Sequence, residues 1–99
     1  MTDQIEIAGR KLPIRRTLGA MKQFDDEFKG EISVFEFETK PKRMEHIVAL
    51  LDYIVQAGFK ADEKPCDVDR EWLMDNIEFD EFEAIIQKIF PPAKKQKKT

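Results

Sequence analysis

The strongest pattern in this sequence is a helical face between residues 44 and 58. Apolar residues recur there at intervals of three and four, the spacing of an amphipathic helix; they are Met44, Ile47, Val48, Leu51, Ile54 and Val55, followed by Gly58. Pro41 suits the first turn of this helix, because a proline there costs no backbone hydrogen bond. Gly58 lies at its end or nearly so. A helix over residues 44–58 is therefore the central expectation.

The length of the chain, 99 residues, limits it to one core. We expect a single globular domain over residues 1–90, followed by a disordered lysine-rich tail over residues 91–99. Cys66 is the only cysteine, so no intramolecular disulfide reinforces the fold. A domain of this size has a thin margin of stability. Its buried apolar residues must pack well, or be shared with a partner or a second copy of the chain.

The N-terminal residues have the pattern of a β-hairpin. Apolar residues alternate with polar residues or alanine on both sides of residues 9–11; they are Ile5, Ile7, Leu12 and Ile14. Gly9 can adopt the positive φ that tight hairpin turns require. Pro13 lacks a backbone donor, which makes the second strand an edge strand. Since two strands alone are marginally stable, the hairpin is expected to lie on the helices.

Further helices are expected on both sides of the central one. Thr17 is a candidate N-cap for a helix whose apolar face ends before Gly30; that face comprises Leu18, Met21, Phe24 and Phe28. Residues 32–37 fit either an imperfect strand or a short helix, and we favour a short helical turn leading into a loop. Asp67 or Asp69 caps a short helix through Ile77, and a last helix over residues 79–90 stops at two prolines. The sum is a helix-rich α+β fold, an N-terminal β-hairpin packed on three to four α-helices.

Neither a catalytic nor a metal-binding pattern emerges from the sequence. Cys66 and His46 are each the only residue of their type, so no cysteine-based zinc site and no nucleophile–histidine set can be assembled. His46 is expected at the surface or at a boundary. Three alternating acids resemble the start of a calcium loop, but Trp72 occupies the position where that loop needs glycine; the acids are Asp67, Asp69 and Glu71. We therefore expect no enzyme, no cofactor and no metal.

Charge divides the chain into an acidic body and a basic end. Residues 62–83 contain ten acids against Lys64 and Arg70, which would repel nucleic acid. The four lysines after residue 93 are not accompanied by aromatic residues that could stack on bases. Neither a signal sequence nor a membrane-spanning segment is recognisable. The expectation is a cytoplasmic protein that binds neither nucleic acid nor membrane.

Aromatic residues suggest a protein-binding surface. The chain has eight phenylalanines, which is more than the interior of so small a domain easily holds. Exposed apolar patches commonly mark protein-binding surfaces, and an acidic surround would keep such a surface soluble. The candidate protein-binding residues are Phe35, Phe37, Trp72, Phe79 and Phe82.

The order of segments resembles the tail assembly chaperones of long-tailed phages and prophages. A hairpin over residues 5–14 leads into residues 15–24, RRTLGAMKQF, similar to the strand pair and first helix of that family. Residues 69–77, DREWLMDNI, and residues 79–90 resemble its closing pair of helices. The resemblance covers about residues 4–90, and it is one of pattern and order.

The resemblance implies a non-structural protein of the infected host cell, absent from the mature virion. It would bind the apolar tape-measure protein and the major tail protein during tail assembly, and self-association is a further expectation. The alternative is a small cytoplasmic protein–protein adaptor or regulator with a different partner. A second rival is a nucleic-acid-binding protein using residues 41–58 and the tail, which the acidic segment opposes.

Overall fold

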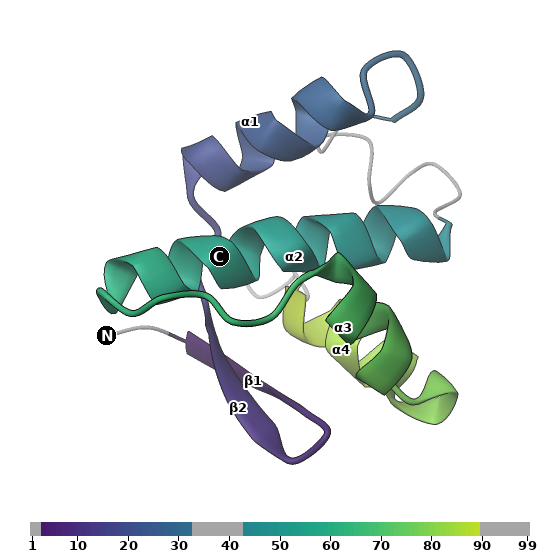
Figure 1. Ribbon diagram of the computed structural model, residues 1–99. Coiled ribbons are helices and arrows are strands. Elements are labelled where there is room, and N and C mark those ends of the chain that lie inside the picture. Colours follow the sequence, from purple (N-terminus) through teal and green to yellow (C-terminus); the bar gives the residue numbers. More distant parts are fainter. Residues whose placement is uncertain (1–2, 33–42, 90–99) are drawn as a thin grey trace, which may run out of the picture.

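The computed structural model describes residues 3–32 and 43–89, and it has a helix-rich α+β fold (Figure 1). The elements are β1 (Asp3–Ile7), β2 (Arg10–Ile14), α1 (Leu18–Glu27), α2 (Met44–Ala61), α3 (Arg70–Asn76), the short 3-10 helix η2 (Phe79–Glu81) and α4 (Phe82–Ile89). Helix α2 runs between α1 on one side and the hairpin with α3 and α4 on the other (Figure 1). The predicted hairpin packed on three to four helices is confirmed. Phe35, Phe37, Pro41 and the tail lie outside the described residues.

The tight turn of the hairpin consists of two residues with positive φ. Ala8 and Gly9 have φ values of 56° and 76°, a combination typical of a type I′ turn. The predicted conformation of Gly9 is confirmed, and strand β2 already begins at Arg10. Alanine rarely adopts a positive φ, so the sequence does not reveal that Ala8 belongs to the turn.

Pro13 occupies a position where its missing N–H group does no harm. It is paired with Gln4, three pairs along from Ile7 and Arg10 at the turn. Antiparallel pairs alternate between hydrogen-bonded and non-hydrogen-bonded, and those flanking a two-residue turn are bonded. Pro13 therefore falls on a non-bonded pair, where its nitrogen faces away from β1, as expected of an edge strand.

Helix α1 begins at the predicted cap. The Thr17 hydroxyl accepts a hydrogen bond from the backbone N–H of Ala20 at 3.1 Å. Ala20, Phe24 and Phe28 are buried, whereas Leu18 is 88% exposed, so the predicted apolar face is wrong at its first residue. Side chains of a helix lean towards its N-terminus, which carries the side chain of the first residue away from the packed face.

Helix α2 is surrounded by the other elements. Its predicted face is buried apart from Met44, and Ala49, Leu50 and Phe59 are buried as well. Gly58 is expected at the end of this helix or nearly so, and the helix continues for less than one further turn, to Ala61. Among the described residues, no helix has both the length and the apolar character needed to cross a membrane.

Gly58 is the point where the backbones of α2 and β2 meet. A Cβ atom at this position would lie 2.3 Å from the carbonyl carbon and oxygen of Pro13. One turn earlier, the carbonyl of Ile54 accepts a hydrogen bond from the N–H of Arg15 at 3.0 Å. A glycine is therefore required here for close packing of a helix on a strand.

We expect Gly58→Ala to reduce the free energy of unfolding by about 2 kcal/mol or more. Alanine is the better helix former by about 1 kcal/mol, but its methyl group would overlap backbone atoms that cannot rotate away. Gly19→Ala is the matched control, because a Cβ atom there would lie 3.8 Å from the Thr17 hydroxyl, an ordinary van der Waals contact. This variant should raise the free energy of unfolding by up to about 1 kcal/mol. Urea unfolding of both variants measures the difference, and a stabilised Gly58→Ala protein would contradict the packing.

Candidate functional site

An apolar groove lies where α2, α3 and η2 meet. It has a volume of about 120 Å³ and seven described lining residues, which are Met44, Val48, Met74, Ile77, Glu78, Phe79 and Phe82. Phe79 is 85% exposed, Met44 58% and Met74 49%. These are three of the four exposed large apolar residues in the described part of the chain, and the fourth is Leu18 on α1. Exposed apolar surface is thus concentrated in one place, which is the usual mark of a binding site.

Local sequence explains how each element contributes to the groove. Met44 and Val48 are four residues apart on α2, so they lie on one face. Helix α3 ends at Asn76, and the backbone of the next residue, Ile77, is extended with φ −82° and ψ 121°. Glu78 is also extended, and the chain then re-enters helical structure at Phe79. This change of direction leaves Phe79 on the outside of the molecule and Phe82, three residues later, half-buried.

A polar network fixes the helix that carries Met74. Arg70, the first residue of α3, forms two contacts with the Glu27 carboxylate, at 2.6 Å and 3.0 Å. It also lies 3.4 Å from the buried carboxylate of Asp52 on α2. The Tyr53 hydroxyl donates a hydrogen bond to Glu27 at 2.6 Å, and the Arg70 guanidinium lies 5.3 Å from the Tyr53 ring centre. Helices α1, α2 and α3 are therefore joined by one guanidinium group.

The segment that supplies most of the groove lining is negatively charged, and one of its acids, Glu78, lines the groove. Residues 70–89 carry six exposed acids, which are Glu71, Asp75, Glu78, Asp80, Glu81 and Glu83. The basic residues of this stretch are Arg70 and Lys88, which leaves a net charge of −4. None of the six acids forms an ion pair with another described residue. Apolar surface on a segment of net negative charge can bind a polypeptide.

The structure places two of the predicted protein-binding residues, Phe79 and Phe82, in this groove. Trp72 is not among the lining residues; it is half-buried against the core, with the Arg10 guanidinium 5.8 Å from its ring centre. Phe35 and Phe37 lie outside the described residues. Sequence reasoning missed Met74 and assigned Met44 to the buried face. Their residue type could have indicated a role in binding, because flexible methionine side chains are common at adaptable binding surfaces.

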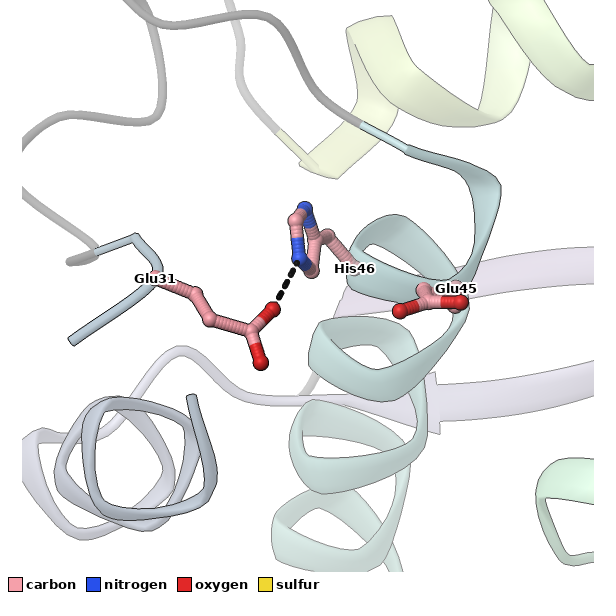
Figure 2. Close-up of side chains that lie close together, drawn as sticks. All are labelled: Glu31, Glu45 and His46. Atoms are coloured by element: carbon pink, nitrogen blue, oxygen red, sulfur yellow. Dashed lines mark hydrogen bonds and ion pairs between the residues drawn. The ribbon is translucent and has the colours of Figure 1, made fainter. Parts of the chain in front are cut away.

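Near the start of α2, His46 is grouped with two glutamates (Figure 2). The ligand atoms of Glu31, Glu45 and His46 all lie within 4.8 Å of one another. The expectation of a surface or boundary histidine is wrong, because His46 is 5% exposed and packs edge-on against Phe28, with ring centres 4.8 Å apart. A buried imidazole beside two carboxylates has the composition of a metal site, so its hydrogen bonds decide its role.

Those hydrogen bonds show that the His46 side chain caps the N-terminus of α2. Its Nδ1 accepts a hydrogen bond from the backbone N–H of Arg43 at 3.3 Å, which places the proton of the neutral ring on Nε2. The Nε2 atom then points at Glu31, 3.5 Å away (Figure 2). A metal on Nε2 would displace that proton to Nδ1 and break the cap. Glu45 is in addition 3.6 Å from the Arg43 guanidinium, which opposes a second cation.

In the comparisons with known proteins, no family model matches the chain, and neither a curated protein nor a solved structure matches it. The apolar groove, its charge and the order of segments in the sequence are therefore the features that bear on function.

We expect the polar network to make stability depend on pH. The hydrogen bonds from Arg70, the largest cause, hold the pKa of Glu27 below its usual value. Ionised Glu27 therefore contributes stability above the ordinary glutamate pKa, and this is lost as the pH falls through the lowered pKa. Arg70→Met should cost about 2 kcal/mol near neutral pH and less in acid. Urea unfolding at several acidic pH values measures the free energy of unfolding of the original protein and of Arg70→Met. If this free energy depended on pH in the same way in the two proteins, the contribution of ionised Glu27 would be contradicted.

Tyr53 provides a second readout, because it is the only tyrosine in the chain. Burial, followed by the hydrogen bond to Glu27, raises the pKa of Tyr53. In Glu27→Gln we expect this pKa to fall towards the value of a free tyrosine, although burial should keep it from returning fully. Ultraviolet absorbance of the tyrosinate during a base titration measures the change. An unchanged titration curve would mean that Glu27 is not the partner of the hydroxyl in solution.

Proposed function

We propose that this protein is a non-enzymatic tail assembly chaperone of a long-tailed phage or prophage. It binds apolar segments of the tape-measure protein, and also the major tail protein, during tail assembly in the cytoplasm of the host. The observation that carries the proposal is the apolar groove, in which Met44, Met74 and Phe79 are exposed together. Surface of this kind is costly to leave in water, so it is expected to have a partner.

The lining chemistry suits a partner with many different binding segments. Methionine has three rotatable bonds and a polarizable sulfur, so Met44 and Met74 can adapt to side chains of different shape. Val48 is buried below them and gives the groove a fixed floor. A chaperone that coats a long protein needs this tolerance, because successive segments differ in sequence.

The negative charge of residues 70–89 supports the same proposal. The six exposed acids of residues 70–89 give each molecule the same negative surface. Copies with like charge repel one another, which opposes non-specific association through the exposed Phe79 ring. The protein can therefore keep an apolar binding surface available while remaining soluble until it meets its partner.

Gene order provides the first test of the proposal. The gene should lie between that of a major tail protein and a very long gene for a tape-measure protein. A position among unrelated metabolic genes would contradict the phage assignment and favour an adaptor with a different partner.

Co-expression provides the biochemical test. A fragment of the tape-measure protein encoded nearby should become soluble only when it is produced together with this protein. Phe79→Asp should remove most of this effect, because it places a charge in the groove; truncating an interface anchor commonly weakens binding by about tenfold or more. Leu18→Asp is the matched control, since Leu18 is equally exposed, at 88%, but does not line the groove. The proposal fails if the fragment is no more soluble with the protein than without it.

A further inference from the structure

We infer that the apolar groove takes a single amphipathic helix whose apolar stripe is flanked by lysine or arginine side chains. This inference deepens the proposed function and rests on it only for the identity of the natural partner.

The dimensions of the groove suit one anchoring side chain with neighbours on either side. Its volume of about 120 Å³ is close to that of cavities that admit a benzene ring. One leucine or phenylalanine of a partner can therefore enter, while residues one turn away contact Phe79 and the two methionines. Anchors separated by three or four residues are the pattern by which helices bind in grooves.

The lining residues also favour a helical occupant over an extended one. All seven belong to helices or to the short connection between α3 and η2, and none belongs to β1 or β2. An extended peptide in this groove would find no strand edge to accept its backbone hydrogen bonds. A helix satisfies its own backbone groups, so it can lose water at the apolar face without leaving polar atoms unpaired.

Charge selects the flanking residues of that helix. Glu78 lines the groove, and Asp75 and Asp80 are exposed beside Met74 and Phe79 in the sequence. Arg70 is occupied by Glu27, and Arg43, next to Met44, lies 3.6 Å from the Glu45 carboxylate. Among residues 3–32 and 43–89, no basic side chain pairs with the acids at the groove. Basic residues beside the apolar stripe would be attracted, whereas acidic ones would be repelled.

The same charge argues against a second copy of the chain as the occupant. Two copies that met through this groove would bring two negatively charged segments together, and juxtaposed like charges oppose association. The chain's own lysine-rich end has suitable charge, but after Phe90 its only apolar residues are two prolines and Ala93. It lacks the anchors at intervals of three and four that the groove would accommodate.

Designed peptides test the inference without the natural partner. The probe is a fluorescently labelled peptide of about 18 residues, roughly five helical turns, with leucine at a helical spacing and lysine elsewhere. A second peptide replaces every lysine by glutamate, and a third keeps the leucine–lysine composition in scrambled order. By fluorescence anisotropy at physiological salt, the ordered lysine peptide should bind at least about tenfold more tightly than either of the others.

Variants of the exposed residues show whether binding occurs in the groove. Phe79→Ala should weaken binding of the lysine peptide about tenfold, whereas Leu18→Ala should leave it unchanged. The double variant Asp75→Lys, Glu78→Lys should reverse the preference towards the glutamate peptide. Asp26 is an exposed acid on α1 that does not line the groove, so Asp26→Lys should preserve the preference for the lysine peptide. Since all these side chains are exposed, loss of folding is not expected to confuse the result.

Four outcomes would overturn the inference. Equal binding of the ordered and scrambled lysine peptides would indicate attraction by charge alone, and equal binding of the lysine and glutamate peptides would show that charge does not select. A peptide of residues 90–99 that binds as tightly as the lysine peptide would assign the groove to the chain itself. A dimer that Phe79→Ala dissociates, measured by analytical ultracentrifugation, would assign it to a second copy. Peptide binding without solubilisation of the tape-measure fragment would leave this inference standing and reject the proposed function.

Discussion

The contact between the backbones of α2 and β2 is the constraint on which the rest of the fold depends. Without a side chain at Gly58, the helix approaches Pro13 closely, and the hydrogen bond from Arg15 to the Ile54 carbonyl holds the two elements together. The hairpin thereby covers one side of α2 while α1 covers another (Figure 1). A two-stranded sheet is barely stable alone, and an apolar helix is insoluble alone. Packing them together stabilises the sheet and removes the apolar surface of the helix from water.

A second layer of organisation is electrostatic. The short helix α3 has one fully buried apolar residue, Leu73, and a helix of seven residues is unstable by itself. Its position is set by the Asp69 cap and by the contacts of Arg70 with Glu27 and Asp52. Because Met74 lies on the same helix and Ile77 directly follows it, these contacts on one side of α3 help to determine the shape of the apolar groove.

The groove combines two features that would each be a liability alone. An exposed phenylalanine invites aggregation, and a dense group of unpaired acids destabilises a compact chain by self-repulsion. Together they favour a particular kind of ligand, one with apolar anchors and basic flanks. His46, the other buried group with suggestive neighbours, is explained by its role in starting α2, and it adds no second site.

The sequence by itself determined the elements of this protein. Local rules sufficed for the hairpin, the Thr17 cap and the amphipathic core of α2, because each depends on residues near one another in the chain; for the cap of α3 they left Asp67 and Asp69 open, and the structure shows Asp69. The number of phenylalanines in so short a chain also made Phe79 and Phe82 candidates for a binding surface. Only the tertiary structure decided that Gly58 is a packing contact, that Leu18 and Met44 are exposed, and that Met74 joins the two phenylalanines. These outcomes depend on which surface of one segment is covered by another segment distant in the chain. The spacing of residues within a single segment does not indicate which surface will be covered.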